Sequence, residues 1–149
     1  MNRSSVLKAV LDTNVIVSGL MFNSGPPYEI IQALLDGLFI MVISEALLAE
    51  YSNVLARPKF SQRYGTIQEN VVAFLALIET QAVKTNPTHP ISLRVRDTKD
   101  ERVIAAALSG EADCLVTGDN DLLVLREEPQ LGQLKIVTAR EFLDILSVS

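Results

Sequence analysis

The sequence predicts an α/β protein, a three-layer α/β/α sandwich built on a parallel sheet of about five strands. Short apolar runs alternate along the chain with segments in which apolar residues recur at helical spacing. The short runs are apolar at nearly every position, which is typical of strands that are buried on both faces. Helices packed on both faces of a parallel sheet provide that burial.

Five segments have the length and the composition of buried strands. They are Val6–Leu11, Leu38–Ile43, a short run near Ala82-Val83, Asp113–Thr117 and Leu134–Val137. Because parallel sheets place ligand sites at the carboxyl ends of their strands, the residues that follow these segments are the first candidates for a functional site.

Helices are indicated between these strands by their start and stop signals. A first helix follows the Gly25-Pro26-Pro27 break, and its apolar residues at helical spacing are Ile30, Ile31, Leu34 and Leu35, up to the stop at Gly37. A second helix is capped by Ser44 and ends near Pro58, with one apolar stripe of Leu47, Leu48, Tyr51, Val54 and Leu55. Capping boxes open three more helices, at Thr66–Glu69, Thr98–Glu101 and Thr138–Glu141.

The composition limits both the size and the chemistry of the protein. A chain of 149 residues, 48% of them hydrophobic, is expected to form one domain over residues 1–149. No apolar run reaches the roughly 18 to 20 residues of a membrane span, and a single cysteine, Cys114, fits a reducing compartment, so we expect a cytoplasmic protein. With His89 as the only histidine, a two-histidine, metal-free ribonuclease mechanism is excluded.

Acidic residues gather at the positions where such a sheet would hold a site. Asp12 ends the first strand, Asp119 follows the fourth, and Asp121 lies two residues further on. Asp100 lies in the first turn of a predicted helix, where the helix dipole favours a negative charge. Glu50 falls at the edge of an apolar helix stripe, so we expect it to be partly buried.

Carboxylates that converge in one place repel each other, and a divalent cation relieves that repulsion. Mg²⁺ and Mn²⁺ prefer hard oxygen ligands of this kind. Each residue also has a plainer interpretation: Asp12 as part of a turn, Asp100 as a helix-terminal charge, and Glu50 as a surface charge. The metal-site hypothesis therefore depends on the whole set lying at one end of the sheet.

Four segments, taken in order, carry a resemblance to a known family. They are Leu11-Asp12-Thr13-Asn14, Ser44 through Glu50, Asp97 through Glu101, and Val116 through Leu123. Their order and spacing over nearly the whole chain resemble the PIN-domain family, and most of all its VapC-like toxins. The resemblance implies a parallel sheet with the strand order 3-2-1-4-5.

The resemblance also implies a function and a set of site residues. It implies a metal-dependent endoribonuclease in which Mg²⁺ or Mn²⁺ is held by the residues matching Asp12, Glu50, Asp100 and Asp119, with Asp121 as a frequent fifth carboxylate. Asn14 and Thr117 match polar positions that support such a site. Metal-activated water would cut the RNA phosphodiester, leaving 3′-hydroxyl and 5′-phosphate ends. Toxin members commonly form homodimers and are blocked by a cognate antitoxin protein.

The third acidic segment offers two aspartates for one position. Asp97 and Asp100 both lie in it, and we prefer Asp100 because it opens the helix and lies eight residues before Leu108, the spacing usual in the family.

The net charge of −5 argues against binding RNA by bulk attraction, so phosphate must be recruited locally. Arg94, Arg96, Lys99 and Arg102 lie beside the third acidic segment. They could contact RNA phosphates or could only neutralise the nearby carboxylates. A weaker basic patch of Arg57, Lys59 and Arg63 is accompanied by Phe60 and Tyr64. It fits either an RNA platform or a helix that buries its aromatic residues.

Other functions remain open from the sequence. A PIN-type nuclease could act in RNA maturation without a toxin role. A catalytically silent interaction module could keep the fold, but it would be expected to lose carboxylates that this chain retains. A phosphotransfer domain using Asp12 would need either a second aspartate where Asn14 stands or an acceptor aspartate on a central strand, which the sequence does not offer.

Overall fold

The computed structural model describes residues 6–57, 68–87 and 98–148. Its strands are β1 (Lys8–Leu11), β2 (Ile40–Ser44), β3 (Val83–Thr85), β4 (Cys114–Val116) and β5 (Lys135–Val137). They form one sheet in the order β3-β2-β1-β4-β5, and every neighbouring pair is parallel. The predicted fold class and strand order are therefore confirmed.

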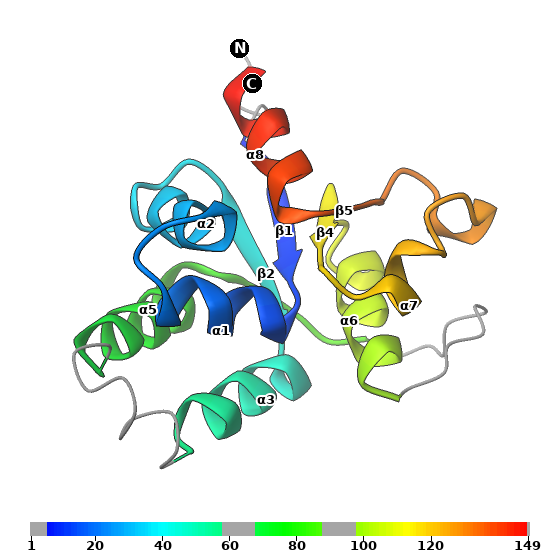
Figure 1. Cartoon of the computed structure of the whole chain (residues 1–149). Helices are drawn as coiled ribbons and strands as arrows, with labels where there is room; N and C mark the ends of the chain where they lie inside the picture. Colours follow the sequence, from blue (N-terminus) through cyan, green and yellow to red (C-terminus); the bar gives the residue numbers. More distant parts are fainter. Residues whose placement is uncertain (1–5, 58–67, 88–97, 149) are drawn as a thin grey trace.

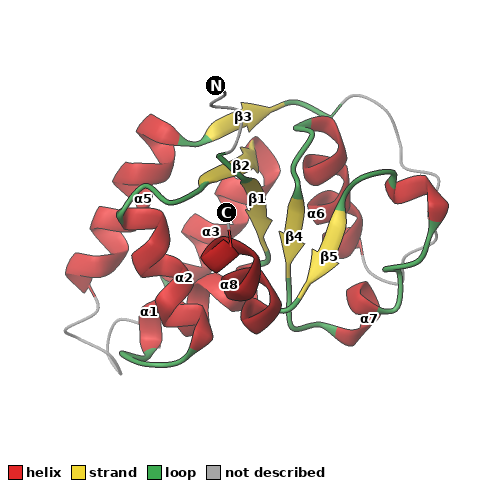
Figure 2. Ribbon diagram, turned by 90° about the horizontal axis from the view of Figure 1, so that it is seen from above, coloured by secondary structure: helices red, strands yellow, loops and turns green. Residues whose placement is uncertain are grey.

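Helices cover both faces of this sheet (Figures 1 and 2). On one face, α6 (Thr98–Ser109) contacts β1, β2 and β4. On the other, α8 (Ala139–Val148) contacts β4 and also packs against α2 (Pro26–Leu35). The central strand β1 is enclosed from its second residue on, because Ala9, Val10 and Leu11 have no exposed surface. Burial on both faces explains why the strand sequences read as unbroken apolar runs.

The remaining α-helices of the described residues are α1 (Thr13–Met21), α3 (Glu45–Leu55), α5 (Gln68–Gln81) and the short α7 (Asn120–Leu123). The first and last of these were not predicted from the sequence. Val15, Ile16 and Val17 are β-branched and Gly19 is a poor helix former, so the local preference for helix is weak. Packing against α2 stabilises α1 instead, since these two helices make extensive contact.

Two predicted caps are confirmed by their hydrogen bonds. The Ser44 hydroxyl accepts a 3.2 Å hydrogen bond from the backbone N–H of Leu47 at the start of α3. At the start of α8, the Glu141 carboxylate accepts from the Thr138 N–H at 2.8 Å, and the Thr138 hydroxyl accepts from the Glu141 N–H at 3.2 Å. Losing such a cap typically costs about 1 kcal/mol.

The structure does not confirm the other two predicted capping boxes, for different reasons. Thr98 is a residue of α6 itself, rather than the cap before it. The predicted box at Thr66 begins outside the described residues. Among the described helices, none combines the length and the apolar character that crossing a membrane requires.

Candidate metal centre

A cavity of about 750 Å³ opens at the carboxyl end of the sheet, between α3 and the first turns of α6. It is lined by Asp12, Thr13, Asn14, Ala46, Ala49, Glu50, Asn53, Val54, Arg57, Lys99, Asp100, Arg102 and Asp119. A second cavity of about 680 Å³ lies beside β5, and its lining contains none of the five predicted site carboxylates. The acidic residues therefore point to the first cavity.

Asp12 follows β1 and is 8% exposed. It occupies the capping position of α1, but its side chain makes no capping hydrogen bond. Instead, its Oδ2 accepts a 2.7 Å hydrogen bond from the Thr117 hydroxyl, which is completely buried. Burial raises the pKa of Asp12 above its ordinary value, and the charges of Asp119 and Glu50 raise it further, while the Thr117 hydrogen bond opposes the rise.

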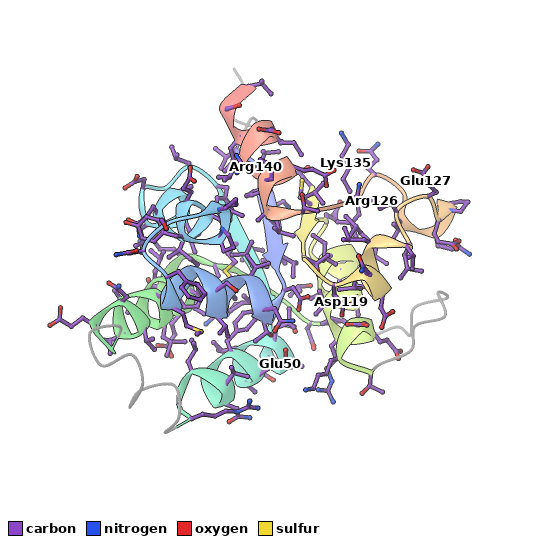
Figure 3. All side chains as sticks on the ribbon, viewed as in Figure 1. Glu50, Asp119, Arg126, Glu127, Lys135 and Arg140 are labelled. Carbon is purple, nitrogen blue, oxygen red and sulfur yellow. The ribbon has the colours of Figure 1, made fainter. Side chains whose placement is uncertain are left out.

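Glu50 is half-buried on α3, as the sequence predicted. The Thr13 hydroxyl donates a short hydrogen bond to its Oε2. Its other oxygen, Oε1, is buried and has no hydrogen-bond partner within the described part of the chain. A buried acceptor of this kind normally costs free energy unless something binds it. Figure 3 places Glu50 and Asp119 at the same end of the sheet.

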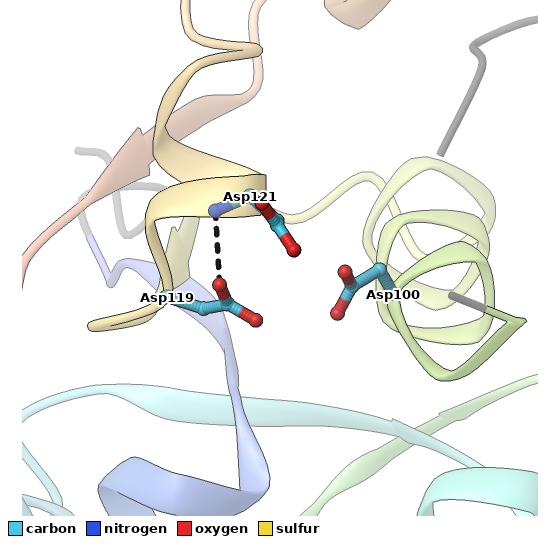
Figure 4. A group of neighbouring side chains, drawn as sticks. All are labelled: Asp100, Asp119 and Asp121. Atoms are coloured by element: carbon cyan, nitrogen blue, oxygen red, sulfur yellow. Dashed lines mark hydrogen bonds between the residues drawn. The ribbon is translucent and has the colours of Figure 1, made fainter. Parts of the chain in front are cut away.

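Three further carboxylates, all from aspartates, lie close together. Asp100, Asp119 and Asp121 each offer a carboxylate oxygen, and these oxygens lie within 4.8 Å of one another. Their carboxylates point toward a shared space between α6 and α7 (Figure 4). The Asp121 N–H donates to Asp119 Oδ1 at 2.9 Å, and the Asp119 N–H donates to the Thr117 hydroxyl at 3.0 Å. Thr117 thus contacts both Asp12 and the segment that carries Asp119.

The structure brings the predicted acidic residues together, while their roles as ligands stay predictions. Asp12, Glu50, Asp100 and Asp119 line one cavity, and Asp121 joins the aspartate group. The two predicted supporting residues differ, since Thr117 is buried against Asp12 and Asn14 is an exposed residue of the cavity wall. The alternative aspartate, Asp97, lies outside the described residues.

Of the predicted RNA contacts, Lys99 and Arg102 line the cavity from α6. Arg94 and Arg96 lie outside the described residues, as does His89. Sequence reasoning did not assign Arg57 or Asn53 to the site, although both line it. Part of the signal was present in the spacing: Glu50 and Asn53 are three positions apart, which places them on one face of α3, while Arg57 lies two residues past the end of that helix.

This donor set fits a hard divalent cation. All of its ligand atoms are carboxylate oxygens, which Mg²⁺ and Mn²⁺ prefer. Glu50 Oε1, for which the described residues offer no hydrogen-bond donor, is a buried acceptor suited to a cation. Burial, and to a smaller extent the charges of Asp119 and Glu50, raises the pKa of Asp12, so its negative charge is unfavourable there and a bound positive ion would stabilise it.

Comparison with known proteins identifies the family to which this fold belongs. A family model described as "PIN domain" matches residues 8–121, a span that includes all five carboxylates. The chain therefore belongs to the PIN domain family, whose members are in general metal-dependent nucleases. It is also 28% identical over 143 residues to an uncharacterized protein of Methanocaldococcus jannaschii, an alignment that covers 93% of this chain and 90% of that relative.

Proposed function

We propose that this protein is an endoribonuclease that hydrolyses RNA phosphodiester bonds with Mg²⁺ or Mn²⁺. Asp12, Glu50, Asp100 and Asp119 would hold the cation, and Asp121 would supply a fifth carboxylate. The observation that supports this most is the arrangement of four carboxylates, separated by up to 107 positions in the sequence, around one cavity. Family membership supports the nuclease chemistry and RNA as the substrate.

In this proposal the carboxylates of the cavity bind the cation, and its basic residues bind the RNA. A divalent cation bound there would lower the pKa of a water and neutralise charge on the scissile phosphate. Arg57 on one wall and Lys99 and Arg102 on the other would attract and orient the RNA backbone. Hydrolysis adds water across the bond between phosphorus and the 3′ oxygen, which leaves a 3′-hydroxyl and a 5′-phosphate.

The three cavity cations also address the problem of net charge. A chain with a charge of −5 repels RNA at long range, so binding has to be local. Positive residues at the cavity, together with a bound cation, would provide such a local site.

The nuclease proposal is tested with purified protein, RNA and Mn²⁺. We expect cleavage that EDTA abolishes and that Asp12→Asn reduces by at least about a hundredfold, in line with the several kcal/mol that a catalytic cation supplies. Asp36→Asn is the matched control, because Asp36 is an exposed acid at the end of α2 and does not line the cavity. Cleavage that survives both EDTA and Asp12→Asn would contradict the proposal.

We further propose that the protein is the toxin of a type II toxin–antitoxin pair, acting as a homodimer that a cognate antitoxin blocks. The support is the resemblance of its motifs to VapC-like toxins. Expression without a partner should arrest growth for the wild type and not for Asp12→Asn. Unimpaired growth together with RNA cleavage would favour a nuclease of RNA maturation. Absence of both, with a folded protein, would favour a silent interaction module. Sedimentation velocity tests the dimer.

A further inference from the structure

A buried tyrosine connects α3 to the end of β1. Tyr51 directly follows Glu50, has no exposed surface, and donates a 2.6 Å hydrogen bond from its hydroxyl to the carbonyl oxygen of Leu11. Leu11 is the last residue of β1 and immediately precedes Asp12. In the sheet, β1 pairs with β2 at Lys8 and Ala9. Leu11 lies after these paired residues, and there the Tyr51 hydroxyl contacts its carbonyl oxygen.

A second contact connects the same helix to the residue after Asp12. The Thr13 hydroxyl donates to the Glu50 carboxylate. The segment Leu11 to Thr13 is therefore held by α3 on both sides of Asp12, by Tyr51 before it and by Glu50 after it. These contacts tie together two carboxylates that lie 38 positions apart in the sequence.

The phenol is suited to a lasting structural contact. Its hydroxyl donates to a backbone carbonyl oxygen at 2.6 Å, and no part of the side chain is exposed to solvent that could compete for this hydrogen bond. Because the side chain is fully enclosed, it has no surface with which to contact RNA.

We propose that Tyr51 is a positioning residue, which fixes the spacing of Asp12 and Glu50 and thereby sets the affinity of the site for a divalent cation. This inference rests on the metal site of the proposed function. Residues that orient metal ligands commonly change metal affinity by roughly 10- to 100-fold when they are removed. Tyr51 would act in this way through the backbone of Leu11, and not by touching the cation.

The test is the affinity for Mn²⁺ alone, measured from the electron paramagnetic resonance signal of free Mn²⁺. Tyr51→Phe keeps the ring and removes only the hydroxyl, and we expect it to weaken Mn²⁺ binding about tenfold. Tyr28→Phe on α2 is the matched control and should leave the affinity unchanged, since Tyr28 does not line the cavity. Thr138→Ala, which loses a helix cap far from the site, controls for lower stability.

Each outcome has one meaning. Weaker Mn²⁺ binding in Tyr51→Phe alone, with unchanged circular dichroism, supports the inference. Wild-type affinity in Tyr51→Phe overturns it, and so does an equal loss in Thr138→Ala, because any destabilisation would then have the same effect. If the wild type binds Mn²⁺ but cuts no RNA, only the nuclease proposal fails. If the wild type binds no Mn²⁺, both fail.

Discussion

The Thr117 hydroxyl donates a 2.7 Å hydrogen bond to the Asp12 carboxylate, across 105 positions of sequence and between the ends of two neighbouring strands. The strands make this contact possible, because Leu11 in β1 pairs with Val116 in β4 and each of these residues directly precedes a member of the hydrogen-bonded pair. The same hydroxyl accepts from the Asp119 N–H. One side chain therefore orients the ends of both strands.

Replacing Thr117 by valine should weaken Mn²⁺ binding by roughly 10- to 100-fold, since it removes the donor that orients Asp12. It should also shift binding to higher pH. The hydrogen bond lowers the pKa of Asp12 against the effect of burial, so its loss raises that pKa further, and Mn²⁺ needs the ionised form. Titrations of Mn²⁺ affinity against pH check this, with Thr117→Ser expected to keep the wild-type curve.

Asp12→Asn should stabilise the metal-free protein at neutral pH. The pKa of Asp12 in the folded state lies above its unfolded value of 3.8, so stability is fully present below that pH and is lost as pH rises through the folded pKa. Asparagine does not ionise and avoids this loss. Thermal melts in EDTA should therefore show a higher Tm for the variant at pH 7 and equal values near pH 3.

Adding Mn²⁺ should reverse that ranking. At a hundredfold excess over Kd, binding stabilises the wild type by about 2.7 kcal/mol, while Asp12→Asn should gain little. A variant that melts lower than the wild type in EDTA would show that the Asp12 carboxylate stabilises the fold.

Arg57→Ala should raise the KM for RNA and leave kcat nearly unchanged, because the residue lines the cavity wall and is absent from the carboxylate group. Loss of one phosphate contact should also reduce the slope of log affinity against log salt by about 0.7, the value for single strands. Arg140→Ala is the control, since Arg140 lies on α8, away from Glu50 and Asp119 (Figure 3). An unchanged salt slope in Arg57→Ala would mean that Arg57 does not contact RNA phosphate.

Gly19→Ala should destabilise the fold by about 1–3 kcal/mol through overpacking. A Cβ at Gly19 would lie 2.6 Å from the backbone oxygen of Pro27 and 2.5 Å from Ile31 Cγ1, and the backbone contact cannot be relieved by a rotamer change. Urea unfolding measures the loss. Gly118→Ala is the comparison, because a Cβ there meets nothing within 4 Å, and its free energy of unfolding should change by less than about 0.5 kcal/mol.

The Cys114 thiol should be unreactive in the native protein at pH 8. It is 2% exposed, and burial raises its pKa from 9.0 to about 11, so about one molecule in a thousand carries the thiolate at that pH. Labelling with a disulfide reagent should be complete in guanidinium and negligible without it. Rapid labelling of the folded protein would show that β4 opens readily.

Cys114 also illustrates which features could be predicted from local pattern. Its apolar neighbours are typical of a buried strand, and it lies buried in β4. The strands were found in the same way, although β1 and β2 each begin two residues later than predicted, because pairing with neighbours sets where a strand begins. Helix α1 was missed, since its β-branched residues carry no strong helix signal and α2 stabilises it from outside.

Some residues of the candidate site could also be predicted from the sequence, and others could not. Asp12, Asp119 and Asp100 were predictable because strand ends and first helical turns are recognisable in sequence. Arg57 was considered only as part of a weaker basic patch, and the structure places it on the cavity wall just past the end of α3.

By itself, the amino-acid sequence predicted the strands, the described helices other than α1 and α7, and the identity of the acidic residues, since these depend on patterns among neighbours a few positions apart. Only the tertiary structure decided how α3 and α6 face each other across the cavity, and which groups contact each carboxylate. The Tyr51 hydrogen bond to Leu11 and the burial of Glu50 Oε1 without a donor from the described residues are examples. Such contacts join residues distant in sequence, and they exist only once the chain has closed its loops and buried its core.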